Sequence, residues 1–510
     1  MKVLPFKTRR LVFANTFSNQ NQILSGAINT TENPNTVNGK IDLFRNAMVE
    51  WCENTTIHRL KNFSRSKNVI HKIIFISLLL ISTGYCISSI SETVISYLKY
   101  DFITRMQITN ETPAYFPVIS FCNLKMLNKL SAKSYLQTIL NDANNNSLIN
   151  KTDYGDNIYG YVNDIETIIQ SSVASEDQTI EFQKSAGYNL SDMLISCSFN
   201  WKTCSEKDFK FFFNSIYGSC YSFNADVPPK SVSVQGPDYG LTIELFMGDP
   251  NVQTEYELDD GIVVVIHNQT NKPYFNSQRN LVSLGTETDL KITRNFIEKL
   301  GQPYSACINF DNNTDFHSEI SDYIINKLKI AYTQQYCFLL CLQKDVMQIC
   351  NCSSIWLPQY LNATYCKADK LNCSSSVTMD ILDGIDNNIC NHECPLECNF
   401  VDYKISTSRS TYPTPYYKSL LSTHSKINSS GIAYNDIEKA VLRVNIFYES
   451  MTYILYQETV TMTPDTLCSN IGGVLGLCTG ASVLLIIEVI ELIIVLFHIN
   501  KSRNSVDQIP

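Results

Sequence analysis

Two long apolar runs constrain this chain more than any other feature of its sequence. Residues 73–90 contain no charged side chain, and residues 471–499 are interrupted only by Glu488 and Glu491. A helix that crosses a bilayer needs about 20 mainly apolar residues, so both runs are long enough. The alternative is a buried helix of a soluble core, but such helices rarely stay apolar on every face for so long. The sequence therefore predicts a membrane protein with two spans.

Charges beside the two runs predict the orientation of the chain. Basic residues precede the first run and follow the second, whereas the opposite flanks are mixed or acidic. Cytoplasmic flanks carry the excess of lysine and arginine, so we expect both termini in the cytosol and the protein in the plasma membrane. The N-terminus has no apolar stretch typical of a signal peptide. We expect a cytosolic arm (1–68), a first span (69–95), an extracellular domain (96–466), a second span with the pore (467–499) and a cytosolic tail (500–510).

The cysteines agree with this topology. Of eighteen, one lies in the arm and three in the expected spans, while fourteen lie between Cys122 and Cys398. An even number confined to an oxidising exterior predicts seven disulfides. Zinc binding by the Cys337–Cys341 or Cys350–Cys352 pairs is the alternative, but these spacings match zinc sites poorly. Ten N-glycosylation sequons in the same region and a net charge of −9 favour a glycoprotein and give no support to nucleic-acid binding.

The extracellular segment reads as a mixed α+β domain. Residues 116–121, 241–246 and 261–267 are apolar, β-branched runs typical of strands, and 441–448 alternates apolar with polar residues. Residues 318–336 have helical spacing of their apolar side chains. The asparagine-rich segment 141–153 predicts an exposed loop tip.

Glu488 and Glu491 are unusual inside an apolar run. Each carboxylate costs about 2.5–3.5 kcal/mol at the centre of a bilayer, so such residues face water or a partner. They share one helix face, and no lysine or arginine within the run can pair with them. A ring of carboxylates lining a cation path is the natural use. The alternative is that they lie in the water interface at the cytosolic end.

Ser482 cannot share that face on a straight helix. Six residues separate it from Glu488, which places the two side chains about 120° apart. Either Ser482 packs against a helix, as we expect for Gly472 and Gly476, or the backbone breaks near Gly480, Ala481 and Ser482. Carbonyl oxygens freed by such a break are tolerated only beside a water-filled cavity, where they could coordinate an ion.

The segment 469–482, followed by Glu488 and Glu491, resembles the pore segment of the epithelial sodium channel/degenerin family. The resemblance implies that Gly480, Ala481 and Ser482 form the selectivity filter, and that Ser469 is the position where bulky residues hold channels open. It implies a trimer whose extracellular domain resembles a hand, with palm, finger, β-ball, knuckle and thumb. It also implies conduction of sodium ions, block by amiloride and contact with membrane lipid.

The resemblance extends along nearly the whole chain and implies the disulfide pairs. Its further blocks are 116–123, 193–200, 217–224, 301–307, 336–341 and 394–398. The pairs it implies are Cys122–Cys220, Cys197–Cys204, Cys307–Cys398, Cys337–Cys394, Cys341–Cys390, Cys350–Cys373 and Cys352–Cys366. We expect structural bonds, each worth about 2–4 kcal/mol, that stiffen the thumb.

Two departures from the family pattern affect gating. Family members usually have His-Gly below the pore, where this chain has His58 and Arg59. Arginine resists the backbone freedom of glycine and adds charge near the cation exit, so we expect a homotrimer to conduct poorly. The alternative is that Arg59 reaches lipid headgroups harmlessly. The histidine pair and the lysine of acid-sensing members are replaced by Asp101-Phe102 and Ser219, which favours an extracellular neuropeptide ligand over acid.

The lead hypothesis is therefore a ligand-gated, sodium-selective channel subunit in a homotrimer or heterotrimer. A non-conducting regulatory subunit of related channels is the main alternative, and acid or mechanical gating stays open. An ATP-gated receptor would have fewer cysteines and no Gly-Ala-Ser motif. We find no metalloprotease, serine-hydrolase, phosphate-loop or dinucleotide motif, so we expect no enzyme, cofactor or bound metal.

Overall fold

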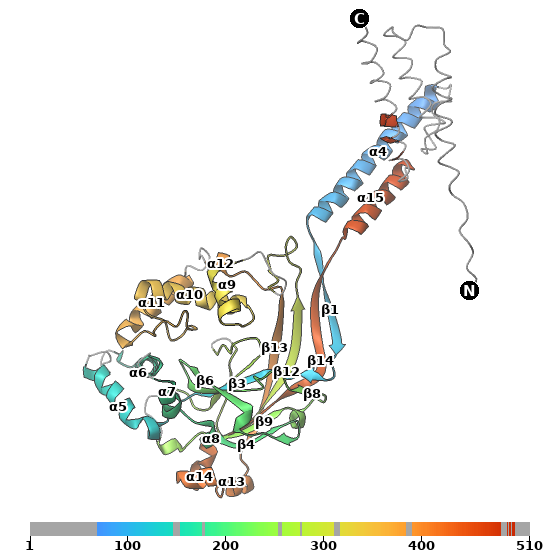
Figure 1. The fold of residues 1–510 in the computed structure, drawn as a ribbon. Helices are drawn as coiled ribbons and strands as arrows, with labels where there is room; N and C mark the ends of the chain where they lie inside the picture. The colour runs from blue at the N-terminus through green and yellow to red at the C-terminus, as the bar shows by residue number, and fades with distance from the viewer. Residues whose placement is uncertain are drawn as a thin grey trace. The chain divides into compact units, whose positions relative to one another are not determined.

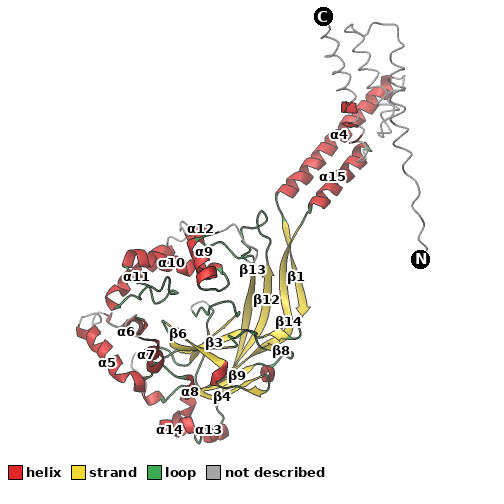
Figure 2. Ribbon diagram, in the orientation of Figure 1, coloured by secondary structure: helices red, strands yellow, loops and turns green. Residues whose placement is uncertain are grey.

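The computed structural model describes residues 69–145, 154–175, 179–252, 258–275, 278–310, 317–383 and 390–480, together with 487, 489, 490 and 492–494. Contacts divide the chain into two units, Met1–Asp101 with Thr461–Pro510 and Phe102–Val460. Of the described elements, the first unit contains helices α4 and α15, and the second contains all of the described strands (Figures 1 and 2).

The first unit pairs helix α4 (Val69–Leu98) with helix α15 (Pro464–Thr479). Among the described residues, α4 is the one helix long and apolar enough to cross a membrane, over Lys72–Leu98. Nearly all of its apolar side chains are exposed, unlike those of a helix in a soluble core. Most of the second predicted span beyond Gly480 lies outside the described residues.

The second unit is built on a seven-stranded sheet of order β13-β12-β14-β9-β4-β5, in which β1 also pairs with β14. β12 and β14 run parallel, and the other neighbours are antiparallel. The strands are β1 (Phe102–Asn110), β4 (Leu194–Phe199), β5 (Lys202–Thr203), β9 (Leu241–Phe246), β12 (Thr286–Glu298), β13 (Asn399–Thr411) and β14 (Val441–Val460).

A five-stranded sheet of order β11-β10-β3-β7-β6 lies beside the seven-stranded one (Figure 2). Its strands are β3 (Val118–Asn123), β6 (Phe209–Asn214), β7 (Gly218–Phe223), β10 (Ile262–His267) and β11 (Asn280–Val282). Every residue of β3, β7 and β10 is buried. Burial on both faces explains why these runs read as continuous apolar stretches without alternation. The four predicted strands are therefore confirmed as β3, β9, β10 and β14, with β3 starting two residues late.

The main core lies between the two sheets. Apolar residues of β3, β7 and β10 pack there with residues of β9, β12 and β14 in one cluster. Aromatic edge-to-face contacts such as Phe116–Tyr448 (5.7 Å) join the sheets. Shorter elements complete the unit: β2 (Ala114–Tyr115), β8 (Ser231–Val232), α8 (Leu190–Met193), α13 (Pro415–Leu421), α14 (Ser425–Ser430), and the turns Glu206–Asp208, Pro237–Tyr239, Pro250–Val252 and Tyr434–Lys439.

Three helices, α5 (Lys129–Asn145), α6 (Ile158–Ala174) and α7 (Ile180–Ala186), form a second core. The predicted loop tip at 141–153 is wrong at its start, because α5 continues to Asn145. Leu136, Ile139 and Ala143 recur at helical spacing and are buried against this core, which holds the asparagine-rich end in the helix. Residues 146–153 lie outside the described residues.

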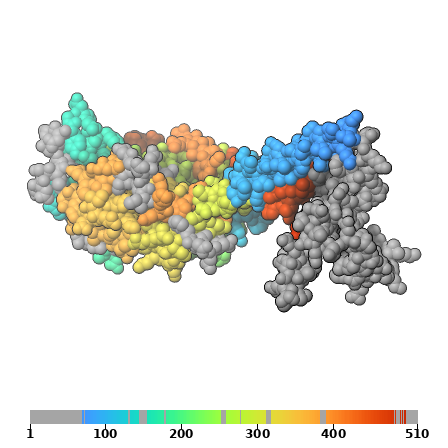
Figure 3. Space-filling view, turned by 90° about the horizontal axis from the view of Figure 1, so that it is seen from above, coloured from blue at the N-terminus to red at the C-terminus, as the bar shows by residue number. Residues whose placement is uncertain are grey.

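The thumb (residues 301–398) contains α9 (Glu319–Asp322), a π-helical turn (Tyr323–Lys327), α10 (Gln334–Cys350), η7 (Ala368–Lys370), α11 (Leu371–Asp383) and α12 (Cys390–Glu393). It covers much of one face of the unit in Figure 3, in yellow to orange. The single helix predicted over 318–336 is wrong, because the chain leaves helical geometry after Lys327. Tyr332 stacks on Phe310 at 3.9 Å, and Thr333 caps the new helix by accepting from the Tyr336 amide.

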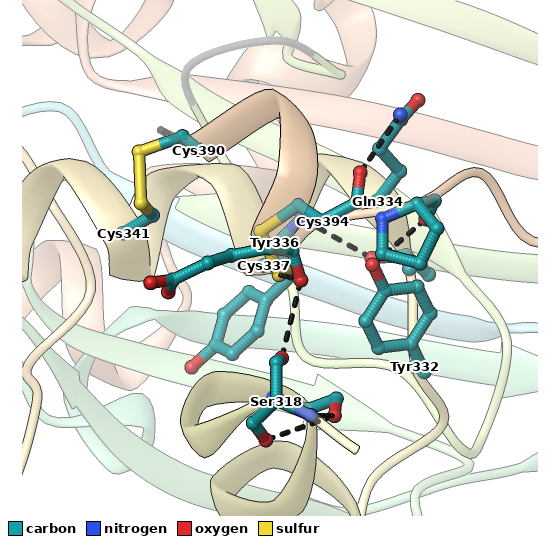
Figure 4. The surroundings of a disulfide bond; sticks show 12 residues. Ser318, Tyr332, Gln334, Tyr336, Cys337, Cys341, Cys390 and Cys394 are labelled. Atoms are coloured by element: carbon teal, nitrogen blue, oxygen red, sulfur yellow. Dashed lines mark hydrogen bonds between the residues drawn. A yellow bond between two sulfur atoms is a disulfide. The ribbon is translucent and has the colours of Figure 1, made fainter. Parts of the chain in front are cut away.

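The structure joins the same seven cysteine pairs that the family resemblance implies. Cys122 and Cys220 are register partners on β3 and β7. In Figure 4, Cys337 and Cys341 lie one turn apart on α10 and bond to Cys394 and Cys390, near the C-terminal end of the thumb. That end is thereby tied to α10, and the bond between Cys307 and Cys398 joins the two ends of the thumb to each other.

Candidate pore segment and the strands that lead to it

Helix α15 begins at a strong local signal. Thr463 accepts a hydrogen bond from the Thr466 amide at 3.2 Å, Pro464 occupies the first helical position, and Asp465 lies in the first turn. These choices satisfy a free amide, fix the backbone angle and place negative charge at the positive end of the helix. The start of the candidate pore helix is therefore determined by its sequence.

One face of α15 packs on α4. Its partly covered residues recur at helical spacing, and they are Leu467, Ile471, Val474, Leu475 and Cys478. Ser82 of α4 donates a hydrogen bond to the carbonyl of Cys478 at 2.6 Å. A hydrogen bond between two otherwise apolar helices fixes the register of one helix against the other.

The opposite face of α15 is exposed and made of small residues. Ser469, Gly472, Gly473, Gly476 and Gly480 all lie on it. A Cβ atom added at Gly472, Gly473 or Gly480 would have no neighbour within 4 Å. Ser469 and Gly480 are eleven residues apart, which brings them to within about 20° of each other around the helix. Two of the predicted site residues therefore share a face that the described part of the chain leaves uncovered.

Helix α15 ends at Thr479, in the middle of the apolar run. Gly480 adopts a left-handed conformation with φ of 69°, and its amide donates to the carbonyl of Gly476 at 3.0 Å. Glycine reaches this conformation without strain, which is why it terminates helices so often. The helix thus ends at the place where one of the two sequence alternatives, a backbone break near Gly480, Ala481 and Ser482, puts the break. Ala481, Ser482, Glu488, Glu491, His58 and Arg59 lie outside the described residues.

The strands nearest to the helices in sequence are β1, which follows α4, and β14, which precedes α15. They form one antiparallel ladder from Phe102 opposite Val460 to Asn110 opposite Thr452. Beyond this ladder β14 makes an irregular step against β12, whose pairing jumps from Ile292–Tyr448 to Arg294–Tyr453. The irregular step therefore lies next to the β1–β14 ladder, whose far end leads to α4 and α15 in the sequence.

Arg294 lies at this irregular step, and the sequence analysis did not identify it as important. It is 3% exposed, forms an ion pair with Glu111, and holds its guanidinium 4.6 Å from the ring of Tyr448 and 5.8 Å from that of Tyr453. Its Nε and Nη2 atoms have no hydrogen-bond partner among the described residues. A buried arginine with one carboxylate and aromatic faces depends strongly on that carboxylate. The sequence feature that could have revealed Arg294 is a charged residue at an inward-facing position of β12, between Ile292 and Phe296.

One group of candidate metal ligands occurs among the described residues, and it comprises Cys341, Asp345 and Cys390. Cys341 and Cys390 are joined in a disulfide. Their sulfur atoms therefore cannot act as thiolate ligands, and the group is no metal site in the oxidised protein.

Comparison with known proteins identifies the family. The family model described as "Amiloride-sensitive sodium channel" matches residues 51–492. The chain belongs to this family. It is thus an ion channel subunit of the epithelial sodium channel/degenerin kind, a membrane protein of sodium ion transport with a disulfide-bonded, β-rich extracellular domain. Channels of this family are plasma membrane proteins and not enzymes.

Individual relatives are similar at low identity. The epithelial sodium channel subunit beta of Neoceratodus forsteri is 28% identical over 60% of this chain and 47% of its own length. The bile acid-sensitive ion channel of Rattus norvegicus is 26% identical over 88% of both chains. The degenerin-like protein asic-2 of Caenorhabditis elegans is 26% identical over 89% of this chain and 87% of its own. The matched region spans about half of the beta subunit and most of the other two.

Proposed function

We propose that this chain is a subunit of a trimeric, sodium-selective, amiloride-sensitive channel with two spans and both termini in the cytosol. The observation that carries the proposal is the small-residue face of α15, which turns away from α4 and ends in the helix break at Gly480. A pore needs such a face to be available to other copies, and it needs carbonyl oxygens near the break.

Three copies of α15 can surround a pore axis, which one chain cannot do alone. Small residues let helices approach closely, so the Ser469–Gly480 face can surround an axis without steric obstruction. On this proposal Gly480, Ala481 and Ser482 form the narrow filter, and Glu488 with Glu491 forms a ring of carboxylates on its cytosolic side. The ring attracts cations and the filter selects among them.

The copies need not be identical. One relative is named as a subunit of an epithelial sodium channel, and assembly with related subunits would relieve the difficulty that Arg59 poses for a homotrimer. A regulatory subunit without current of its own is the second candidate, supported by Arg59 at the position where the family has glycine. Arg59→Gly should then increase the current of the homotrimer, and equal currents would remove this argument.

We propose that a ligand of the extracellular domain opens the channel. The neuropeptide expected from the sequence finds no support among the relatives, one of which is named for sensitivity to bile acids. The disulfide-stiffened thumb and the β1–β14 ladder offer a rigid route for such a signal.

Whole-cell recording after expression alone tests the proposal. Sodium should carry an inward current under one of four conditions, namely rest, an acid step, a neuropeptide panel or bile acids, and amiloride should block it. Replacement of sodium by N-methyl-D-glucamine should abolish the current. Inward current that survives this replacement would contradict sodium selectivity, and silence under every condition would favour the regulatory subunit.

Ser469 provides a matched test of the pore face. Ser469→Phe places a bulky ring on the small-residue face and should leave a standing current in the absence of stimulus. Cys468→Phe is the control, because Cys468 is also exposed but lies about 100° around the helix. Equal effects of the two variants would show that α15 does not present the Ser469 face to the pore.

A further inference from the structure

Two cysteines that take no part in the seven disulfides face each other in the helix pair. Cys86 lies in the second half of α4, and Cys478 lies in the last turn of α15. The thiol of Cys86 is within hydrogen-bond reach of the thiol of Cys478. Cys468, which is also free, is exposed near the start of α15. The described part of the helix pair therefore brings together two thiols that belong to different helices.

The surroundings of this thiol pair hold the two helices close together. Ser82 lies one turn before Cys86 on α4, and its hydroxyl donates the 2.6 Å hydrogen bond to the carbonyl of Cys478. The backbone of α15 is therefore only one short side chain away from α4 at this level. Cys86 is 3% exposed, and it is the one buried residue of α4 among those whose side chains the structure describes. The thiol contact is thus the most enclosed point of α4.

The thiol pair lies beside the break in the candidate pore helix. Cys478 precedes Gly480 by two residues, and α15 ends at Thr479. The amide of Gly480 donates to the carbonyl of Gly476, so the last turn that contains Cys478 is the turn that the left-handed glycine closes. A covalent bond at Cys478 would therefore attach the end of α15 to α4 immediately before the break.

We propose that Cys86 and Cys478 form a redox-responsive pair, which hydrogen peroxide converts into a disulfide between α4 and α15. A disulfide needs sulfur atoms about 2.05 Å apart and Cα atoms about 4.4–6.8 Å apart. The two thiols are already in contact, and the hydrogen bond of Ser82 already joins the helices one turn away. Side-chain rotation and a small closing movement of the two helices are enough to reach this geometry.

The reaction consumes one peroxide molecule and releases two water molecules. Cys478 is partly exposed and Cys86 is buried, so peroxide reaches Cys478 first. Its sulfur attacks as the thiolate: an S–O bond forms, the O–O bond breaks, and the leaving hydroxide takes the proton of the thiol. The sulfur of Cys86 then attacks the resulting sulfenic acid. The S–S bond forms, the S–O bond breaks, and hydroxide leaves as water with the proton of Cys86, so the two sulfurs are oxidised and the peroxide is reduced.

The bond would regulate the pore, and this consequence rests on the function proposed above. Helix α15 carries the small-residue face and ends in the break, so a bond to α4 holds both features where they were when oxidation occurred. Movement of α15 against α4 then stops, and the current should lose its response to the stimulus that opens the channel. Dithiothreitol should restore the response, because thiol–disulfide exchange cleaves the bond.

Peptide mapping of the full chain in lipid nanodiscs tests the bond without any current. The protein is treated with hydrogen peroxide, its remaining thiols are alkylated with N-ethylmaleimide, and it is digested without reduction. Mass spectrometry should find the peptides of Cys86 and Cys478 joined, and dithiothreitol should separate them. The oxidised chain should still migrate as a monomer in a non-reducing denaturing gel. Absence of the joined peptides, or their presence only in a covalent dimer, would overturn the proposal.

Three variants assign the roles of the thiols. Cys86→Ser removes the second thiol, so dimedone should trap the sulfenic acid at Cys478, and the response of the current should survive peroxide. Cys478→Ser should give little dimedone label at the buried Cys86, and a label as strong as that of Cys478 would overturn the order of attack. Cys468→Ser is the control and should form the joined peptides as the parent does.

Recording and mapping fail separately. Joined peptides in a channel that still responds to its stimulus would overturn the regulatory role of the bond. A chain that carries no current contradicts the proposed function and leaves the mapping result intact.

Discussion

The two units of this chain reach stability in different ways. In Phe102–Val460 the sheets enclose a core of fully buried side chains, seven disulfides close the chain on itself, and the buried Arg294 of β12 pairs with Glu111 just after β1. In the helix pair, α4 exposes nearly all of its apolar side chains and α15 leaves its glycine face uncovered.

The contrast predicts that the stability of the strand-rich unit depends on one copy of the chain, whereas that of the helix pair depends on other molecules. The strand-rich unit buries its core side chains within one copy of the chain, so substitutions there should act on the folding of the single chain. On the proposed function, lipid surrounds the helix pair and further copies pack against α15, so substitutions there should act on assembly and current. Each prediction below tests one side of this contrast.

The largest effect is expected from the thumb. Cys337→Ser with Cys394→Ser removes a bond between fully buried positions and should lower the stability of the extracellular unit by about 2–5 kcal/mol, enough to reduce surface delivery strongly. Surface biotinylation and thermal unfolding measure this. Cys468→Ser, which changes a free and exposed cysteine of α15, is the control and should change neither. Equal surface levels for all three proteins would refute the structural role of the ladder.

The next effect is expected at the β14 step. Glu111→Gln leaves the guanidinium of Arg294 buried without its carboxylate and should cost about 3 kcal/mol of unfolding free energy. Replacing both residues, as Glu111→Gln with Arg294→Met, should recover much of that loss, because no unpaired charge remains. Chemical denaturation of the parent, Glu111→Gln, Arg294→Met and the double variant gives the coupling energy. A double variant that is no better than Glu111→Gln would show that the ion pair itself is not the cause.

A matched pair of glycines tests the contrast directly. A Cβ at Gly240 would collide with the carbonyl of Ile446 and with Phe447, so Gly240→Ala should destabilise the strand-rich unit by about 1–3 kcal/mol. A Cβ at Gly472 would have no neighbour within 4 Å in the described part of the chain, so Gly472→Ala should leave the unfolding free energy unchanged. Gly472→Leu should in addition reduce trimer formation in native electrophoresis. Intact trimers in Gly472→Leu would mean that other copies do not pack on this face.

Part of this architecture could be read from the sequence. The continuous apolar run gave β10, because a strand buried on both faces needs no alternation, and other strand-like runs gave β3 and β9. The angle between Ser482 and Glu488, a property of any α-helix, left either packing of Ser482 or a break in the helix, and the structure ends the helix at Gly480. The disulfide pairs came from resemblance alone, since fourteen cysteines permit far too many connectivities for spacing to decide.

Other parts could not be read, because they depend on residues distant in the chain. Arg294 contradicts the inward alternation of β12, and its partner Glu111 lies 183 residues away. A polar pocket joins the ends of β10 and β11 to β13, and no local pattern relates these segments. The asparagine-rich end of α5 was misjudged because packing on α6 overrides weak local preference for a helix.

The smallest effect is expected at Glu166 of α6, where the strand-rich unit holds a half-buried carboxyl group. Burial and the nearby Asp259 raise the pKa of Glu166 from 4.5 to about 7. As the pH rises from about 4.5 to about 7, the unfolded chain releases this proton before the folded chain does, so the group lowers stability across that window.

Glu166→Gln should therefore unfold at a higher temperature than the parent at pH 7, and the two unfolding temperatures should converge towards pH 4.5. Asp259→Asn removes the second cause, so it should shift the same window to lower pH without abolishing it. Thermal unfolding of the full chain between pH 4 and pH 8 measures all three profiles. A constant difference between Glu166→Gln and the parent across this range would mean that the carboxyl group titrates outside the window, and would place Glu166 among the groups whose charge the fold accommodates without cost.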